Sequence, residues 1–518
     1  KKMIKKKLPL ITYAALAIIA FIFNFWVGTK GVFPIDTFLH YDAAYKILSG
    51  EKPVKDYWTI FGITLDYIQS IFFYLFGVNW ISYISHSSLF NSVLTIIFFK
   101  FLNKLNFQYI YSIPLAICFL ILAYPISGVP FIDHHATFFS LISLFIFYFG
   151  LVNKNYKQFI FIPIIFGLAF FSKPVPSAYL CLVFIIIFIA YFIPEKKKEP
   201  FLYILYGAIL LLLLTFFFLQ IENIPISNFF EQLILYPFSI GGDRTNSILE
   251  AVKIRMFNYK FIYVLLFYLI FLLTFKKNFR KFSKPNLYLL VTFILFSIIM
   301  VMHQILTKNQ NFIFFLIPLN TCLVLYVNNH IELKNNKRVN FFFLILCIFL
   351  TFKYFDRFID KRKFHDLQNV NLKNAISAKT IHESLYPLNW ITLNYEDPKE
   401  EVKMIKELVN NIESSGEKIL LISNYNFVDS ITEKKVLIVA KNFDNVVVPQ
   451  KKNKYRENFK NFFSNNIKKN KIKEIYLFFP KINNFQRFGI NLKNFLYPMC
   501  FDSQDINSMT IKLKIKNC

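Results

Sequence analysis

The sequence has few charged residues for its length, and acidic ones are scarcest. Asp and Glu together number 31, against 59 Lys and Arg in 518 residues, so charged residues make up only 17%. A soluble domain has about 25%. Instead, 55% of the residues are hydrophobic, many in runs of roughly 17 to 22 that can cross a hydrocarbon layer of about 30 Å as a helix. This composition excludes an ordinary soluble enzyme and indicates an integral membrane protein.

The sequence also lacks an arginine-rich motif and any signature of a nucleic-acid-binding fold. The formal net charge of +28 would otherwise favour a nucleic-acid partner. The basic residues gather instead at the ends of the apolar runs, where rules of membrane orientation place them. We therefore expect the lipid bilayer, and no nucleic acid, as a partner.

Cysteine is scarce, with six residues in the chain. Cys500 and Cys518 lie in the polar C-terminal part, where they can form a disulfide if this part is outside the cytoplasm. The other four lie within apolar runs, and we expect them to pack as small hydrophobic side chains.

The apolar runs predict about eleven membrane-spanning helices. They cover residues 8–28, 84–103, 110–126, 136–152, 158–172, 177–194, 201–221, 258–275, 286–305, 311–329 and 339–354. With the basic N-terminus in the cytoplasm, every connection expected on that side is basic, whereas the opposite short connections hold only Lys173 and Lys308. Counting the apolar segment 60–77 as a span would invert this pattern, so we interpret it as an interfacial or re-entrant helix.

These predictions give an all-α polytopic transmembrane bundle over residues 1–354, with juxtamembrane helices in a long first outer loop. A small extracytoplasmic α/β domain follows over residues 355–518. It is expected to hold helices at 397–415 and 457–467 and strands at 418–423, 435–440 and 474–480. The domain shows no glycine loop for phosphate and no cluster of metal ligands, which favours an accessory or partner-binding role over a second active site.

The first outer loop carries the residues with the clearest chemistry. Pro34 can start a helix that places Asp36 and His40 on one face, and Gly50 then ends it. Three polar residues follow the helix, namely Lys52, Lys55 and Asp56. The alternative is an amphipathic surface helix whose polar residues are only solvated.

The stretch 36–62 resembles the first periplasmic loop of the GT-C glycosyltransferases, in the branch of protein O-mannosyltransferases and lipid A aminoarabinose transferases. The matching residues are Asp36, Tyr41, Ala43, Ala44, Ile47, Leu48, Gly50, Pro53, Asp56, Tyr57 and Gly62. The chain departs from the family at Thr37 and Phe38, where Glu-Gly is usual, and at Ile63, where Pro is usual.

The resemblance implies a glycosyltransferase of the bacterial inner membrane with an extracytoplasmic C-terminal domain. Such an enzyme transfers a sugar from a polyprenyl-phosphate donor to a hydroxyl of a glycan, lipid or protein acceptor on the outer side of the membrane. The first-loop Asp is the general base in this family, a role that falls here on Asp36. Displacement by a single base inverts the anomeric centre. His40, Tyr41 and Asp56 are expected to contact substrate.

Cations are needed to hold the donor phosphate. The candidates are Lys52 or Lys55, Lys173, Arg244 and Lys308. Lys173 lies at the outer end of a hairpin of two spans, in a run that resembles the family's Gly-Leu-x-x-Leu-Thr-Lys. Its alternative role is to snorkel to the interface. Arg244 lies in a glycine-bearing loop, which can also be a plain surface turn.

Asp133, His134 and His135 form a second cluster at the start of the fourth span. We expect these residues to contact substrate. A divalent metal held by Asp36 and Asp133 is the alternative, as is a helix cap by Asp133. The mannosyltransferase branch is generally independent of metal, and no cofactor is expected.

Two functions from other classes compete with the transferase. The first is a transporter or flippase of lipid-linked or envelope precursors, which would place charged residues at mid-span depth and repeat its halves. Here the ionisable residues collect at the outer edge instead. The second is a non-catalytic scaffold that uses the C-terminal domain as a receptor.

Overall fold

The computed structural model describes residues 2–245, 256–307, 312–331, 336–444, 446–479 and 500–516. The chain divides into two compact units that alternate along the sequence. The membrane unit comprises residues 1–28, 84–218 and 243–364, and the loop-and-tail unit comprises residues 29–83, 219–242 and 365–518. The sequence predicted one boundary at residue 354, whereas the compact units group the first loop with the tail.

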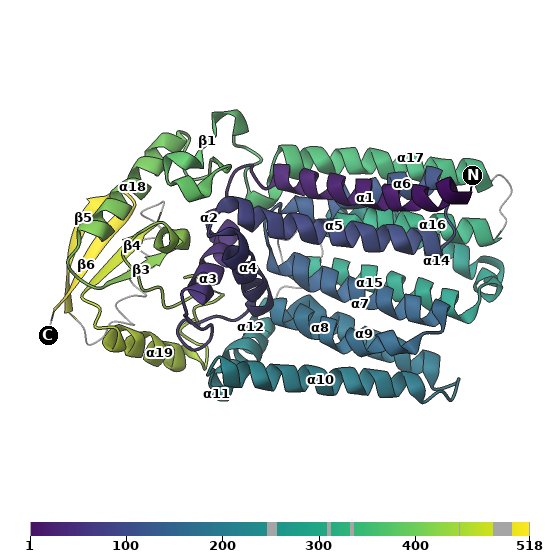
Figure 1. Ribbon diagram of the computed structural model, residues 1–518, viewed down its shortest axis with the longest axis horizontal. Helices are drawn as coiled ribbons and strands as arrows, with labels where there is room; N and C mark the ends of the chain where they lie inside the picture. The colour runs from purple at the N-terminus through teal and green to yellow at the C-terminus, as the bar shows by residue number, and fades with distance from the viewer. Residues whose placement is uncertain are drawn as a thin grey trace. The chain divides into compact units, whose positions relative to one another are not determined.

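The membrane unit is built from long apolar helices, most of them running alongside one another (Figure 1). They are α1 (Lys2–Val27), α5 (Trp80–Lys104), α6 (Tyr109–Leu122), α7 (Ile132–Asn153), α8 (Phe161–Ser172), α9 (Pro174–Phe192), α10 (Glu199–Ile221), α14 (Lys260–Thr274), α15 (Lys284–Thr307), α16 (Leu316–Ile331) and α17 (Asn336–Phe355). Within the described residues, ten helices are long and apolar enough to cross a membrane. The one remaining predicted span, 158–172, falls on the shorter apolar helix Tyr156–Ser172.

Small and polar side chains let these helices approach one another closely. The Asn91 amide on α5 donates to the carbonyl oxygen of Ala20 on α1 at 3.1 Å and to that of Leu120 on α6 at 3.2 Å. A Cβ atom at Gly28 would lie 2.7 Å from the carbonyl oxygen of Gly128. Contacts of this kind hold helices together where lipid offers no hydrophobic driving force.

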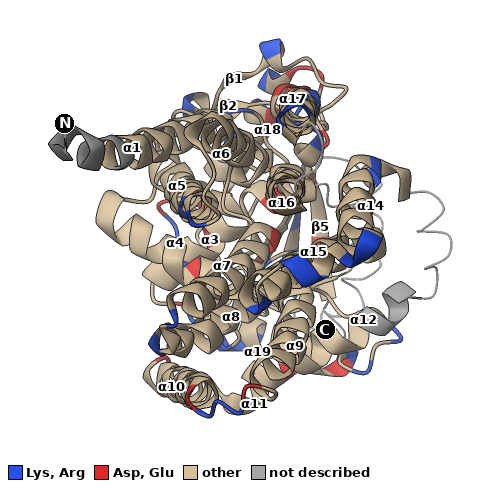
Figure 2. Cartoon of the chain, turned by 90° about the vertical axis from the view of Figure 1, so that its right-hand side faces the viewer, with Lys and Arg blue, Asp and Glu red and all other residues tan. Residues whose placement is uncertain are grey.

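One end of the membrane unit is basic. Figure 2 shows Lys and Arg on the connections between helices at the end that faces the viewer. The Lys104 ammonium bonds the Asn153 amide oxygen at 2.8 Å, and the Lys284 ammonium bonds the Glu195 carboxylate at 2.6 Å. The positive-inside rule predicts that such an end faces the cytoplasm.

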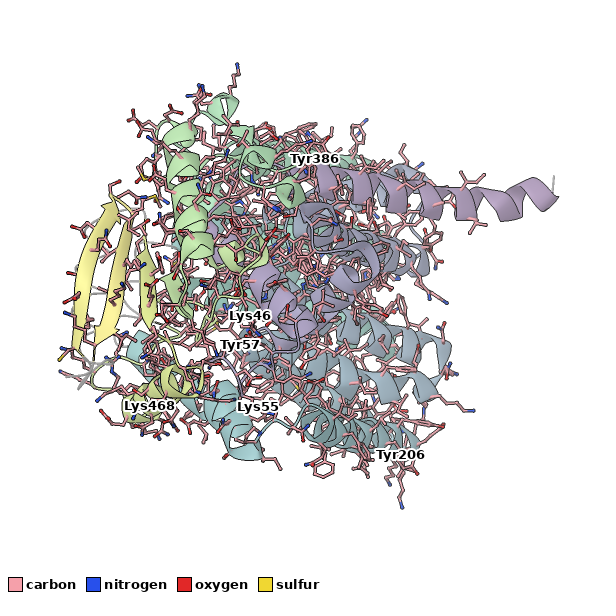
Figure 3. All side chains as sticks on the ribbon, turned by 60° about the vertical axis from the view of Figure 1, so that its left-hand side comes forward. Lys46, Lys55, Tyr57, Tyr206, Tyr386 and Lys468 are labelled. Atoms are coloured by element: carbon pink, nitrogen blue, oxygen red, sulfur yellow. The ribbon has the colours of Figure 1, made fainter. Side chains whose placement is uncertain are left out.

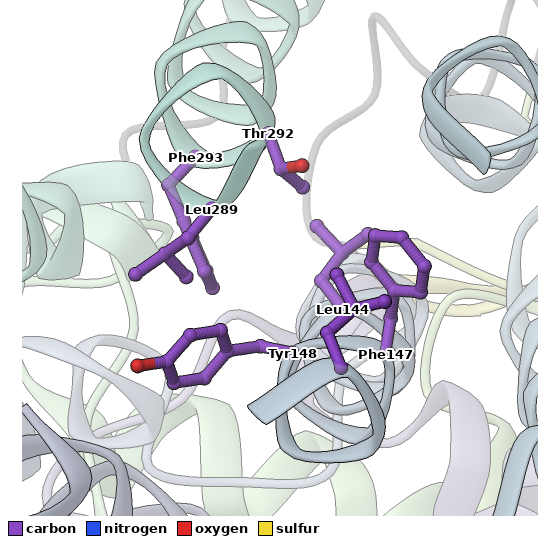
Figure 4. A pocket seen from close by; sticks show the side chains of 7 residues that line it. Leu144, Phe147, Tyr148, Leu289, Thr292 and Phe293 are labelled. Atoms are coloured by element: carbon purple, nitrogen blue, oxygen red, sulfur yellow. The ribbon is translucent and has the colours of Figure 1, made fainter. Parts of the chain in front are cut away.

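The bundle also contains a small pocket between α7 and α15 (Figure 4). Its lining residues are Leu144, Phe147, Tyr148, Leu151, Leu289, Thr292 and Phe293. The Thr292 hydroxyl already donates to the carbonyl oxygen of Tyr288 at 2.6 Å. This apolar pocket carries no group suited to sugar transfer.

The loop-and-tail unit combines short helices of the first loop with a four-stranded sheet from the tail. The helices are α2 (Pro34–Thr37), α3 (Leu39–Leu48), α4 (Ile63–Phe76), α11 (Ile226–Phe230), α12 (Tyr236–Thr245), α18 (Pro398–Ser414) and α19 (Arg456–Lys469). The strands are β1 (Ile376–Ser377), β2 (Asn389–Trp390), β3 (Ile419–Ser423), β4 (Glu474–Phe478), β5 (Cys500–Asn507) and β6 (Thr510–Lys516). The sheet order is β3-β4-β6-β5, with β3 and β4 parallel and the other pairs antiparallel.

The helix predicted at 397–415 is confirmed as α18. The Asp397 side chain caps it by accepting from the backbone N–H of Lys399 at 2.9 Å. The apolar positions expected to face the core are all buried, and they are Val402, Ile405, Leu408 and Ile412. The helix predicted at 457–467 and the strands at 418–423 and 474–480 are confirmed as α19, β3 and β4.

The strand predicted at 435–440 is wrong, because this segment divides its backbone hydrogen bonds between two partners. Leu437 exchanges hydrogen bonds of 2.9 Å with β3, donating to Ile419 and accepting from Leu421. Two residues later, the Val439 carbonyl oxygen accepts from the backbone N–H of Trp58 in the first loop at 2.8 Å. The segment thereby ties the first loop to the tail sheet within this unit.

Cys500 is in a disulfide. Cys518, the partner that the sequence suggests, lies outside the described residues. The four cysteines of the apolar spans are free thiols, as expected.

Candidate functional site

Asp36 lies on α2, the first short helix of the loop-and-tail unit. Pro34 occupies the first turn of this helix, as predicted, because its fixed φ angle suits that position. The Asp36 side chain is partly exposed. Partial exposure of this residue is compatible with contact to a substrate hydroxyl, which a general base requires.

The single helix predicted from Pro34 onward is wrong, because the chain breaks at Phe38. α2 ends at Thr37, whose hydroxyl accepts from the backbone N–H of Phe33 at 2.9 Å. The buried Phe38 ring stacks on Phe427 of the tail, with ring centroids 4.2 Å apart. Asp36 therefore lies on α2 and His40 on α3.

Gly50 follows the end of α3, as predicted, in a left-handed conformation with φ +91°. His40 and Tyr41 on α3 are fully buried. In this conformation neither side chain presents a surface to a substrate.

His40 is part of a buried charge cluster that joins the first loop to the tail. Its Nδ1 lies 2.6 Å from the Asp66 Oδ1 of α4. The other carboxylate oxygen of Asp66 accepts from the Lys441 ammonium, which also donates to the carbonyl oxygen of Phe61 at 3.2 Å. His40, Asp66 and Lys441 have fully buried side chains.

Burial disfavours the charged form of each member of this cluster. It lowers the pKa of His40 well below its ordinary range, so the ring is neutral at pH 7 and Nδ1–H donates to Asp66. Burial also raises the pKa of Asp66 to about 7, against the opposing influence of Lys441, whose own pKa is lowered by burial. Removing any one partner from such a buried cluster is expected to destabilise the folded protein.

A second buried set surrounds Lys46 on α3. Its ammonium lies 3.0 Å from the Asp42 carboxylate and donates to the carbonyl oxygen of Ile438 in the tail at 3.2 Å. Burial raises the pKa of Asp42 to about 6, although Lys46 opposes the rise. Burial also raises the pKa of Asp429 to about 7, with repulsion from Asp42 as the next cause.

We expect Asp429→Asn to stabilise the protein at pH 8 and to leave its stability nearly unchanged at pH 4. The native carboxyl binds its proton more tightly than the unfolded one, so native stability falls as pH rises from 3.8 to about 7. Asn never ionises, and its amide oxygen can still accept from the backbone N–H of Val436, now 3.0 Å from Asp429 Oδ1. The gain at pH 8 is at most about 4 kcal/mol.

Melting temperatures of the two proteins at both pH values measure this difference. An equal difference at pH 4 and pH 8 would show that the buried carboxyl is not its source.

The membrane unit holds a separate set of predicted residues, an ion pair between Lys173 and Asp133. Lys173 is the extended residue between α8 and α9, and Asp133 lies in the first turn of α7. The ammonium donates to both carboxylate oxygens at 2.7 Å. The Asp133 side chain is fully buried, whereas that of Lys173 is 18% exposed.

Two further features stabilise the Asp133 carboxylate. The His303 Nε2 on α15 lies 3.6 Å from its Oδ1. A negative charge is also favourable in the first turn of a helix. The carboxylate thus holds the Lys173 ammonium at the end of the bundle where α7 begins and α8 and α15 end. The Lys173 side chain is not fully covered by the described residues.

His134 and His135 are both fully buried. His135 lies 2.7 Å from the Tyr124 hydroxyl through Nδ1 and 3.1 Å from His86 Nε2 through its own Nε2. The His134 ring packs against aromatic rings, with Phe312 5.0 Å away between centroids. These positions do not favour direct contact with a substrate.

The remaining predicted cations differ in their surroundings. Lys52 is paired with Glu222, and Lys55 is exposed. The Asp56 carboxylate accepts from the backbone N–H of Lys52 at 2.8 Å, which supports the turn after α3. Arg244 falls in α12 with its side chain not described, and Lys308 lies outside the described residues.

The described residues contain no group of three or more His, Cys, Asp or Glu placed to hold a metal ion. Asp36 and Asp133 belong to different compact units.

Sequence reasoning missed Asp66, Lys441 and His303. Asp66 is the only charged residue in the apolar helix Ile63–Phe76, and His303 lies within an apolar span. An ionisable residue in such a segment is costly without a partner, which is a signal that can be recognised in a sequence. Lys441 has no comparable signal, because it is one lysine among many.

No family model matches the chain, and no curated protein matches it.

Proposed function

We propose that the protein is a membrane glycosyltransferase that takes its sugar from a polyprenyl-phosphate donor. The observation that carries this proposal is the Lys173–Asp133 ion pair. It supplies a fixed cation at one end of an apolar bundle, where a lipid phosphate would lie. The likeness of the first loop to GT-C glycosyltransferases supports the same function.

In the proposed reaction Asp36 accepts the proton of the acceptor hydroxyl. The acceptor oxygen then forms a bond to the anomeric carbon while the bond from that carbon to the phosphate oxygen breaks. Polyprenyl phosphate leaves with the electron pair, and the anomeric centre is inverted. General-base catalysis of this kind contributes about 10²–10⁴-fold.

Lys173 has the complementary role of binding the donor phosphate. Asp133 takes two of its hydrogen bonds at 2.7 Å and fixes the direction of the ammonium. Negative charge grows on the phosphate as the sugar leaves, so a positioned cation stabilises the transition state. Asp133 is thus a positioning residue for Lys173 in this mechanism.

The experiment that tests the function is transfer by the purified protein in lipid nanodiscs. Polyprenyl-phosphate sugars extracted from host membranes serve as donors, and a host envelope fraction serves as acceptor. Transfer of a sugar with release of polyprenyl phosphate is expected. Movement of intact donor across a bilayer without cleavage would favour the flippase instead. If neither transfer nor movement of the donor is observed, the non-catalytic scaffold is favoured.

We expect Lys173→Ala to weaken donor binding about 10–100-fold, because one charge-assisted hydrogen bond to phosphate is worth about 1.5–3 kcal/mol. The rate of the chemical step at saturating donor should fall less. Donor affinity is measured by titration in nanodiscs. The matched control is Lys157→Ala, at an exposed lysine in the short helix Tyr156–Ile160. Unchanged donor affinity in Lys173→Ala would remove this residue from the site.

A further inference from the structure

The tail has an uneven distribution of charge along its sequence. Residues 365–450 contain nine Lys and Arg and twelve Asp and Glu, so they are slightly acidic. Residues 451–473 contain nine Lys and Arg and one acidic residue, Glu457. A general enrichment of lysine in the chain does not produce such a contrast between adjacent segments.

The structure collects this charge on α19 and its two flanks. We call the exposed lysines of this segment the α19 lysine surface, made of Lys451, Lys452, Lys454, Lys468, Lys469, Lys471 and Lys473. The Lys469 ammonium lies 3.9 Å from the Asp56 carboxylate of the first loop. Lys55, next to Asp56, and Lys468 are labelled in Figure 3. The α19 lysine surface therefore continues toward the loop that carries Asp36.

Aromatic packing fixes α19 on the first loop. The Trp58 ring contacts the rings of Phe459 and Phe462 edge-on, at 5.3 and 5.7 Å between centroids. The Trp58 indole N–H donates to the carbonyl oxygen of Val447 at 3.1 Å. The Asn458 amide donates to Glu231 at 2.8 Å. The lysines thus lie in two groups at the two ends of α19, whose length is about 21 Å.

The surroundings of these lysines favour a soluble polyanion over a lipid surface. A helix that lies in a membrane interface exposes large apolar side chains beside its basic residues. In the described part of the tail from 446 to 479, no large apolar side chain is exposed. Of the apolar residues of α19, Phe459, Phe463 and Ile467 are buried, and Phe462 is partly buried against Trp58.

We propose that the α19 lysine surface binds a soluble anionic polymer whose repeating units carry phosphate or carboxylate groups. Lysine is a common phosphate ligand that acts as a point charge. Two groups of lysines at the ends of one helix contact several units of such a chain at once. On the proposed transferase function, this polymer is the acceptor, or the carrier of the acceptor, and the surface presents it beside the first loop.

The test measures binding of fluorescent linear inorganic polyphosphate to the full-length protein in nanodiscs of neutral lipid. We expect the native protein to bind it and the variant K468Q/K469Q/K471Q/K473Q to bind at least about tenfold more weakly at low salt. The slope of log affinity against log salt should also fall by about 3, because four counterion-releasing contacts are lost.

The control variant K399Q/K403Q/K406Q/K418Q removes four exposed lysines, three on α18 and one directly before β3. It should bind as the native protein does. An equal loss in the two variants, or no binding by the native protein, would overturn the proposal. Binding to vesicles of phosphatidylglycerol but not to polyphosphate would overturn it in favour of a membrane surface.

If the quadruple variant K468Q/K469Q/K471Q/K473Q fails to fold, the double variant K468Q/K473Q repeats the test with a smaller expected loss of polyphosphate affinity. The binding measurement requires no sugar transfer. Its failure is therefore distinct from a failure of the proposed transferase function, and either can occur alone.

Discussion

Replacing Asp36 by Asn is expected to lower the rate of sugar transfer by about 10²–10⁴-fold. Asn keeps the size and hydrogen-bonding capacity of the side chain but cannot take the acceptor proton. Asp36 is partly exposed on a short helix, so the exchange should leave folding unchanged. Donor binding should be retained, because the proposed phosphate contact is made by Lys173. Turnover and donor affinity are measured on the same nanodisc preparation.

Asp56→Asn is the matched control for this prediction. Asp56 lies in the same loop and is also partly exposed, but its carboxylate accepts from the backbone of Lys52. We expect its transfer rate to stay within a few-fold of the native rate. An equal loss of transfer rate in the two variants would indicate that both exchanges disturb the folding of the loop. Full turnover in Asp36→Asn would exclude Asp36 as the base.

Replacing Lys441 by Met is expected to destabilise the loop-and-tail unit by about 3–5 kcal/mol. The exchange leaves Asp66 buried beside a neutral His40 without the cation that lowers its pKa, so the carboxyl must either take up a proton or stay charged without a partner. Three of the four tryptophans, Trp58, Trp80 and Trp390, are buried in this unit, so thermal unfolding followed by tryptophan fluorescence reports mainly on it. The melting temperature should fall by several degrees or more.

The double variant Lys441→Met with Asp66→Asn separates charge from packing. It removes both charges, and the amide oxygen introduced on α4 can still accept from the His40 ring. We expect it to regain most of the stability lost in Lys441→Met, because an uncompensated buried charge costs more than the pair contributes. A double variant as unstable as the single one would show that packing of the lysine stem matters more than its charge.

The membrane helices could be located from the sequence because length and hydropathy alone determine which segments can span a bilayer. Ten of the predicted spans correspond to long helices in the described residues. α18 could be predicted for a similar reason, since its apolar residues recur at helical spacing and Asp397 supplies a cap. Both signals are local.

In the tail, β6 was not predicted although it has a local signal, and the strand predicted at 435–440 is wrong. β6 alternates Ile511, Leu513 and Ile515 with lysines, the period of a strand. The segment 435–440 has the composition of a strand, but its hydrogen bonds are divided between β3 and Trp58. Composition cannot reveal such a division, because it depends on the tertiary structure.

The candidate site was predictable only in part. Pro34 and Gly50 marked the limits of the helical segment, but the break at Phe38 depends on its packing against Phe427, far away in the sequence. The ion pair of Lys173 with Asp133 joins two residues that the sequence had singled out separately. The pairing of Asp66 with Lys441 links residues 375 positions apart, and no local pattern indicates it.

The most direct test of the transferase is mass spectrometry of lipids and envelope glycans from cells that produce either the native protein or Asp36→Asn. We expect cells with the variant to accumulate one polyprenyl-phosphate sugar and to lose the glycoconjugate made from it, as cells without the protein do. Identical lipid and glycan profiles in native and variant cells would contradict the proposed function.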